Sequence, residues 1–224
     1  MSKRYEQAVK ERTLAVLANI DGELCAQVAV GLGLSMPAAT EPLVGIRPSP
    51  ALSQIGRTWP VHGRTIGIVA DRPLDMSGVR EARQAVLDAG MVPLVITPAG
   101  GVLGAGGDPV TVQRTFATAR SVEFDARLFV GLPGAGADAY GARDAKAGDP
   151  RPATSDPRVM AMLTEAYRHG KAIAGWGGAE ALFETADISV GEPGVIVTDG
   201  VQALPQLLKI LAAHRVWERF PATT

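Results

Sequence analysis

Residues 166–184 read AYRHGKAIAGWGGAEALFE and indicate the end of a helix, a short apolar strand and an abrupt turn into another helix. A strand that passes directly into a helix at a glycine-rich turn is typical of α/β proteins with a parallel sheet. Several α/β enzymes hold a nucleophile on such a turn. Here the predicted turn is Gly175-Trp176-Gly177-Gly178, which offers no Cys, Ser or Thr. The stretch therefore predicts the fold class and argues against acyl or thiol chemistry at this position.

The same alternation of strand and helix continues from residue 64 to the end of the chain. Apolar strands are predicted at 65–70, 92–97, 127–133, 171–175 and 194–199, and helices at 77–89, 156–169, 178–185 and 202–218. Strands separated by helices pair in parallel through right-handed crossovers, with helices on both faces. We therefore predict an α/β fold, a flavodoxin-like doubly wound parallel sheet. Glycine-rich composition predicts a small hairpin at 98–112 and a mobile loop at 134–156.

A helical segment and a linker precede this domain. Residues 1–33 contain two helical patterns, and Asp21 between them is the expected N-cap of the second. Residues 34–63 contain five prolines and no sustained period, which predicts an extended linker. The expected organisation is therefore a helical segment at 1–33, a linker at 34–63 and a flavodoxin-like domain at 64–224.

Composition excludes several classes of partner. The chain of 224 residues is 46% hydrophobic and 20% charged, with a formal net charge of −1, so it has no basic excess with which to bind nucleic acid. It has no apolar stretch near the roughly 18 residues that a membrane span needs. A lone cysteine, Cys25, excludes an intrachain disulfide or thiolate zinc site and favours a reducing compartment. We therefore expect a cytoplasmic protein with no nucleic-acid or membrane partner.

Candidate ligand-binding residues follow the strands, because ligands of open α/β sheets bind beyond the strands' carboxyl ends. Asp71 and Asp75 follow the first strand, but their loop lacks the hydroxyl-rich turn that would hold an FMN phosphate. Gly134 and Gly136 follow the third strand, where an anion could be cradled, but no Lys, Ser or Thr follows to complete a phosphate site. These four residues outline a candidate crevice beside the turn at 175–178.

The histidines and the cysteine have simpler explanations than catalysis. His169 is expected at a helix C-terminus, where a positive charge is favourable. His214 lies in a predicted helical stretch, where it could cap the helix, pair with a carboxylate or meet another subunit, and His62 lies in the linker. No histidines and carboxylates share metal-ligand spacing, so no metal site is predicted. Cys25 lies on an apolar helical stripe and is expected to be a buried, unreactive thiol.

Several stretches together resemble one family. The segments AYRHGKAIAGWGGAEAL, GVIV and LLKILAAHRVWERFP are similar to the C-terminal domain of large-subunit (clade 2) haem catalases. Near the N-terminus, LANIDGELCAQVAVGLGL and SPALS resemble the helical segment and linker that join the catalase core to that domain. The resemblance runs from about residue 10 to the end of the chain. It implies the flavodoxin-like fold of the ThiJ/PfpI and class I glutamine amidotransferase-like superfamily.

The resemblance also implies which chemistry this chain lacks. Active members of that superfamily place a Cys at the strand-to-helix turn and a Glu after the first strand, whereas this chain offers Trp176, Asp71 and Asp75. The family's haem is held in the core domain by a distal His and Asn and a proximal Tyr. The tyrosines of this chain lie in no such context. Neither catalytic residues nor a haem cofactor are therefore expected in this chain.

Two hypotheses follow from the resemblance. In the first, the chain is a non-catalytic module that stabilises the hydrogen-peroxide-decomposing catalase tetramer, with the catalase core and sister subunits of a homo-oligomer as its partners. A role as a molecular chaperone for unfolded client proteins belongs to the same hypothesis. In the second, the chain is a small-molecule enzyme of the ThiJ/PfpI superfamily with unrecognised chemistry at the strand carboxyl ends.

Overall fold

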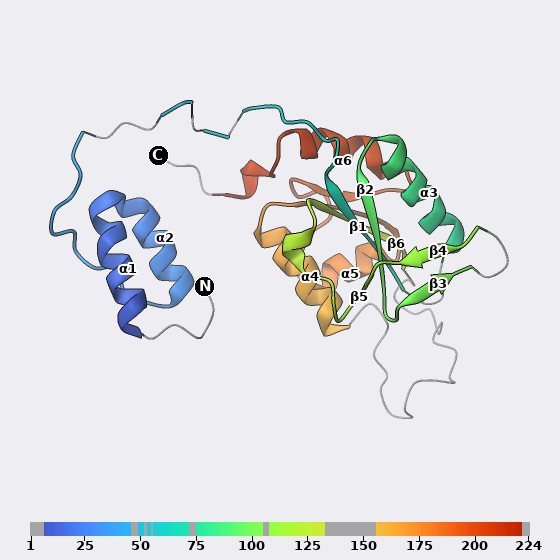
Figure 1. Ribbon diagram of the computed structural model, residues 1–224, viewed down its shortest axis with the longest axis horizontal. Helices are drawn as coiled ribbons and strands as arrows, with labels where there is room; N and C mark the ends of the chain where they lie inside the picture. Colours follow the sequence, from blue (N-terminus) through green and yellow to red (C-terminus); the bar gives the residue numbers. More distant parts are fainter. Residues whose placement is uncertain are drawn as a thin grey trace, which may run out of the picture. The chain divides into compact units, whose positions relative to one another are not determined.

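The computed structural model describes residues 7–45, 49–51, 53–54, 56–71, 75–104, 108–132 and 156–220. The chain divides into two compact units, Met1–Ser53 and Gln54–Thr224, and Figure 1 shows the elements of each. The predicted linker at 34–63 is thereby shared between the two units. The predicted mobile loop lies, apart from its last residue, outside the described residues.

The first unit is a pair of helices, α1 (Gln7–Ile20) and α2 (Gly22–Leu32). The side chain of Asp21 accepts a hydrogen bond from the N–H of Leu24 at 3.0 Å, which caps the first turn of α2 as expected. Gly33 ends α2 in the left-handed conformation with φ 67°. The buried residues between the helices are Leu14, Ala18, Cys25 and Ala29.

Residues that follow this helical pair are tied back to it by one asparagine. The side-chain oxygen of Asn19 accepts hydrogen bonds from the N–H groups of Thr40 at 2.8 Å and Glu41 at 2.9 Å. The N–H of Leu43 donates to the Asn19 carbonyl oxygen at 2.8 Å. Residues 34–45 form no helix or strand, yet their backbone is fixed at these points.

The second unit is built on a six-stranded sheet in the order β5-β2-β1-β6-β7-β8. Every neighbouring pair in this sheet is parallel. The strands are β1 (Thr65–Ala70), β2 (Val92–Thr97), β5 (Arg114–Thr115), β6 (Ala126–Leu132), β7 (Ala172–Gly177) and β8 (Val195–Val197). The prediction of a flavodoxin-like parallel sheet is confirmed. The edge strand β5 was not predicted, because two residues are too few to show a period.

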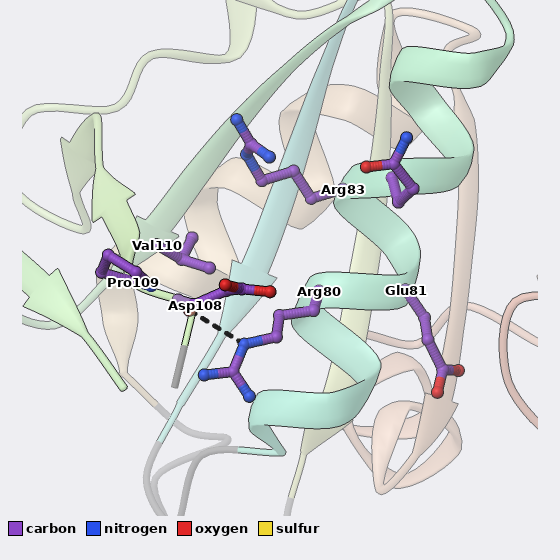
Figure 2. Close-up of a pocket in the computed structure, with 7 residues that line it drawn as sticks. Arg80, Glu81, Arg83, Asp108, Pro109 and Val110 are labelled. Atoms are coloured by element: carbon purple, nitrogen blue, oxygen red, sulfur yellow. Dashed lines mark hydrogen bonds between the residues drawn. The ribbon is translucent and has the colours of Figure 1, made fainter. Parts of the chain in front are cut away.

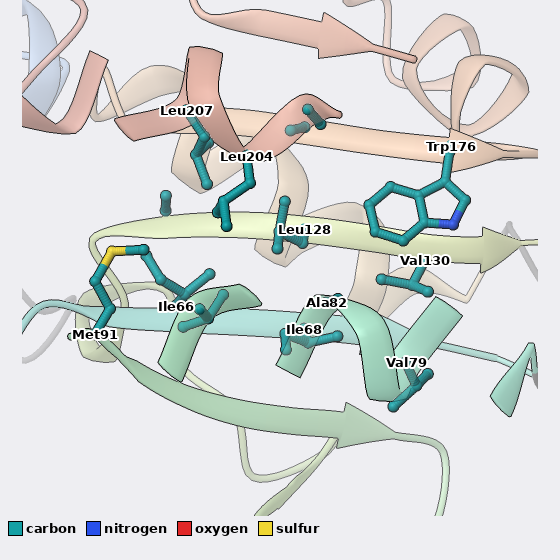
Figure 3. Packing of buried hydrophobic residues seen from close by; sticks show 14 of the residues in the cluster. Ile66, Ile68, Val79, Ala82, Met91, Leu128, Val130, Trp176, Leu204 and Leu207 are labelled. Carbon is teal, nitrogen blue, oxygen red and sulfur yellow. The ribbon is translucent and has the colours of Figure 1, made fainter. Parts of the chain in front are cut away.

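Helices cover both faces of the sheet. On one face pack α3 (Met76–Asp88) and α6 (Ala203–Ala212), and on the other pack α4 (Pro157–Arg168) and α5 (Ala179–Thr185). Figure 3 shows the first face, where side chains of α3 and α6 meet those of β1 and β6. The predicted hairpin is present as β3 (Gly101–Leu103) paired antiparallel with β4 (Val110–Val112).

The end of the last helix differs from the sequence-based expectation. The predicted helix at 202–218 is wrong beyond Ala212, where α6 ends. His214 has φ 71°, a left-handed conformation that stops the helix. The chain then turns so that Val216 is buried and its N–H donates to the Gly170 carbonyl oxygen at 2.7 Å. A 3-10 turn, η3 (Trp217–Arg219), follows. The apolar pattern of the sequence extends beyond Ala212 because Val216 is also buried, but against a different part of the domain and not on the same helix.

Candidate functional site

The strand-to-helix turn after β7 begins later along the chain, and spans fewer residues, than predicted. β7 extends through Gly177, and α5 begins two residues further on at Ala179. Gly177 has φ 67°, so the left-handed position of the turn is held by a residue without a side chain. At Gly175 the helix approaches the strand closely, since a Cβ there would lie 2.5 Å from the Cβ of Ala179. The backbone therefore passes directly from strand into helix, with a glycine at the left-handed position.

Trp176 lies within β7, one residue before the left-handed Gly177. It is the penultimate residue of β7, and only 7% of its surface is exposed. Figure 3 shows its indole on the face of the sheet covered by α3 and α6, next to Val130 of β6. A tryptophan between glycines suggested a turn, but Gly175 and Gly177 on either side of it both pair with β6, with a register shift between the two pairs. The indole is therefore a core side chain.

The two aspartates predicted after the first strand lie at this carboxyl end of the sheet. Asp75 is the N-cap of α3, and its carboxylate accepts a hydrogen bond from the N–H of Gly78 at 2.9 Å. The carboxylate fills the space beside Gly78 and Gly131, because a Cβ at either glycine would lie 2.3 Å from an Asp75 side-chain atom. Asp71 is 3% exposed and also makes an interaction. Asp75 thus joins α3 to β6 by packing and capping.

The other predicted site residues are not brought together by the described structure. Gly134 and Gly136 lie outside the described residues. His169 is the C-cap of α4 and exposed, and His62 is exposed beside Gly90. Within the described ranges, no group of three or more His, Cys, Asp or Glu side chains could hold a metal ion.

Two buried cations near the amino ends of β6 and β7 were missed by sequence reasoning. Lys171 donates to the carbonyl oxygens of Ser121, in the turn η1 (Ser121–Glu123), and of Phe124, the latter at 2.7 Å. Burial, aided by Arg215 and Arg127, lowers the pKa of Lys171 to about 8. The guanidinium of Arg127 lies 4.5 Å from the centre of the Phe124 ring, and burial lowers its pKa to about 10.

Lys171 anchors the backbone around η1 to the sheet, and Arg127 packs against the ring of Phe124. They lie at the opposite edge from the carboxyl ends of the strands, where ligands of such sheets bind. The Nε and Nη2 atoms of Arg127 have no hydrogen-bond partner among the described residues. Nothing in the residue types alone signalled these roles, because Lys and Arg at strand starts are usually solvated.

A shallow polar hollow lies between α3 and the β3–β4 hairpin (Figure 2). Its volume is about 320 Å³. Arg80 crosses it and donates from Nε to the Asp108 carbonyl oxygen at 3.0 Å. Charges of both signs line the hollow, so it selects for neither anions nor cations. The lining residues are Arg80, Glu81, Arg83, Gln84, Asp108, Pro109 and Val110.

The architecture and the turn define the class of protein. A doubly wound parallel sheet with helices on both faces is a flavodoxin-like domain, and Gly177, the left-handed residue that ends β7, has no nucleophilic side chain. Residues 62–221 match the family of C-terminal domains found in long catalases, and the chain belongs to that family. No helix in the described part of the chain is long and apolar enough to cross a membrane.

Curated relatives extend the similarity over nearly the whole chain. Catalase HPII of Pseudomonas aeruginosa is 32% identical across 100% of this chain, and Catalase HPII of Mycobacterium avium is 30% identical across 94% of it. Catalase-2 of Bacillus subtilis is 26% identical across 98% of the chain. In each case this chain spans 30% of the relative's length. The match includes the helical pair that precedes the family's domain.

Proposed function

We propose that this chain is a non-catalytic module of a large catalase, which binds the haem-bearing core and stabilises the tetramer that decomposes hydrogen peroxide. The observation that supports this most strongly is membership of the long-catalase C-terminal family, in a chain that spans 30% of its relatives. The partners proposed here are the catalase core and sister subunits of a homo-oligomer.

The helical pair supplies the proposed contact surface for the core. Apolar side chains on α1 and α2 are exposed, at 54% for Val16, 51% for Ile20 and 45% for Leu24. Large apolar side chains left exposed on both helices of the pair favour a protein partner. Because the relatives match this helical pair as well as the domain, the rest of the catalase chain is the partner that we propose.

The one tyrosine within the described ranges, Tyr167, does not fit the role of a haem ligand. Tyr167 could serve as an axial ligand only through its phenolic oxygen, but that hydroxyl donates to Glu192, and the guanidinium of Arg219 lies 4.3 Å from the ring centre. The hydrogen bond to Glu192 raises the pKa of Tyr167, which opposes formation of the phenolate that a haem iron would bind. We therefore propose that haem is held by the core and that this chain alone does not decompose peroxide.

The strand-to-helix turn supports a non-catalytic role over a small-molecule enzyme. We infer that the turn is a degenerate elbow of the ThiJ/PfpI type, in which Gly177 occupies the strained position and Gly175 and Gly178 allow the close approach of α5. A nucleophile elbow requires a reactive side chain on that position, and glycine has none. The second hypothesis would need chemistry from residues elsewhere along the crevice.

The test is reconstitution with a large-catalase core from which its own C-terminal domain has been removed. The purified chain should co-elute with that core and raise the temperature at which peroxide decomposition is lost. At a concentration of 100 Kd, binding of this kind adds about 2.7 kcal/mol of stability. Failure to co-elute, together with an unchanged inactivation temperature, would refute the proposal.

A matched pair of variants locates the contact. Val16→Glu combined with Ile20→Glu should abolish binding, because burying carboxylates in an apolar interface is costly. Val122→Glu is the control, since Val122 is 82% exposed on η1 in the other unit. The chaperone role makes a different prediction from the stabilising role. The chain would suppress aggregation of a heated client protein without binding the core, and Val16→Glu combined with Ile20→Glu would abolish that suppression.

A further inference from the structure

The segment that enters the α/β domain is held against the end of α6. The N–H of Trp59 donates to the carbonyl oxygen of Ala212, the last residue of α6, at 2.7 Å. The Trp59 ring lies 6.3 Å from the ring of His214, tilted by 55°. Arg64, just before β1, donates from Nε to the Pro60 carbonyl oxygen at 3.0 Å. Residues 59–64 are thus joined to a turn about 150 positions later in the chain.

His214 stands at the centre of this contact, between two guanidinium groups. Its Nδ1 lies 3.2 Å from Nη1 of Arg64 and 3.5 Å from Nη1 of Arg215. Arginine nitrogens can only donate hydrogen bonds, and they stay protonated at all ordinary pH values. The Nδ1 atom must therefore be the acceptor, which assigns the ring proton to Nε2. The contact is compatible only with a neutral imidazole.

The surroundings of His214 contain one compensating negative charge. Asp125, just before β6, pairs with Arg64 at 3.5 Å and accepts a hydrogen bond from the Thr65 N–H at 3.0 Å. Asp125 raises the pKa of His214, but burial and then Arg215 and Arg64 lower it by more. The two rings beside His214, those of Trp59 at 6.3 Å and Trp217 at 6.5 Å, are uncharged.

We propose that His214 is an acid-sensitive latch: the neutral ring ties residues 59–64 to the end of α6, and protonation of Nδ1 breaks its hydrogen bond with Arg64 and releases that segment. One proton is taken up and one hydrogen bond is lost, so the step is reversible. Every group involved belongs to the unit Gln54–Thr224. The latch can therefore be tested on this chain alone, whether or not the chain binds a catalase core.

The sign of the pH dependence follows from linkage. The pKa of His214 is lower in the folded state than its ordinary value of about 6.5, so the unfolded or released state binds the proton more tightly. The latch is fully closed above pH of about 6.5 and weakens as the pH falls towards the folded-state pKa. Over that window its closed-to-open ratio falls by up to about tenfold per pH unit.

The test combines histidine titration by NMR with hydrogen exchange at the Trp59 amide. His214 should titrate below its ordinary value of about 6.5. The protection factor of the Trp59 amide, corrected for the intrinsic pH dependence of exchange, should decrease in step with that titration.

A substitution at the latch separates it from general acid destabilisation. His214→Asn keeps a residue that tolerates the left-handed conformation and an oxygen that can accept from Arg64, but it cannot be protonated in this range. It should keep Trp59 protected at neutral pH and remove the acid-dependent loss. His169→Asn should leave the acid-dependent loss unchanged.

Three results would overturn the latch. They are a His214 pKa at or above its ordinary value of about 6.5, Trp59 protection that stays constant through the His214 titration, and an acid-dependent loss that persists in His214→Asn. The first two are measured on the unmodified chain, so they decide the matter even if the variant does not fold.

Discussion

Replacement of Trp176 by alanine tests whether its indole is a core side chain. The ring lies in the cluster between the sheet and the helices α3 and α6, with 7% of the residue exposed. Val130 lies next to it in Figure 3, and Val79 and Leu204 belong to the same cluster. Since β7 is bounded by β6 and β8, the backbone cannot readily move to fill the space that a truncated side chain would leave.

The expected cost follows from the size of the lost group. Truncation of a buried Trp to Ala typically costs about 3–5 kcal/mol, through lost burial and the cavity that remains. For a domain of this size each kcal/mol lowers the melting temperature by about 2–4 °C. Trp176→Ala should therefore lower the melting temperature by about 6–20 °C. An indole that merely covered a surface crevice would cost far less.

The assay is thermal unfolding followed by circular dichroism, with two comparison variants. Trp176→Phe should retain most of the stability, because a smaller ring still fills much of the site. Phe220→Ala removes an aromatic ring that is 41% exposed and lies outside the buried clusters, so its melt should shift by less than half as much. Equal shifts for Trp176→Ala and Phe220→Ala would refute the placement of Trp176 in the core.

Two further predictions concern other buried positions. Cys25 is fully buried, and its Sγ lies 3.3 Å from the Leu14 carbonyl oxygen. A thiol reagent should therefore not label Cys25 without denaturant. The control is Val30→Cys, at a site that is 81% exposed on the same helix, which should label at once. Fast labelling of Cys25 would show that the helical pair opens. Gly175→Ala should cost about 1–3 kcal/mol by overpacking against Ala179. The control is Gly100→Ala, whose added Cβ would lie 3.8 Å from its nearest neighbour and which should unfold at the same temperature as the parent. Equal melting temperatures for Gly175→Ala and Gly100→Ala would contradict close packing at β7.

Much of the fold could be predicted because the signals are local. The strand at 65–70 reads TIGIVA, a short apolar run of β-branched residues, and it forms β1 with the predicted bounds. Asp21 caps the start of α2 as expected from its side chain, and Gly33 ends the helix because glycine readily adopts the left-handed conformation. Such features require no knowledge of what lies across the domain.

The candidate site was predicted less well because its geometry depends on pairing between distant segments. The residue types at 175–178 showed that no nucleophile is present, but not which of them occupies the turn. Pairing with β6 extends β7 through Gly177 and buries Trp176. The end of α6 was missed for the same kind of reason. The N–H of Val216 donates to the carbonyl oxygen of Gly170, in a distant segment, and the helix does not continue.

By itself, the sequence determined the order of strands and helices, the parallel sheet, the absence of a nucleophile after β7 and the likeness to the long-catalase family. All of these follow from residue type and spacing along the chain. Only the tertiary structure decided that Trp176 is a core residue, that Lys171 and Arg127 are buried, and that His214 faces Arg64 across 150 positions of sequence. The physical reason is that burial and charge contacts are properties of neighbours in space, and a single sequence does not state which distant residues become neighbours.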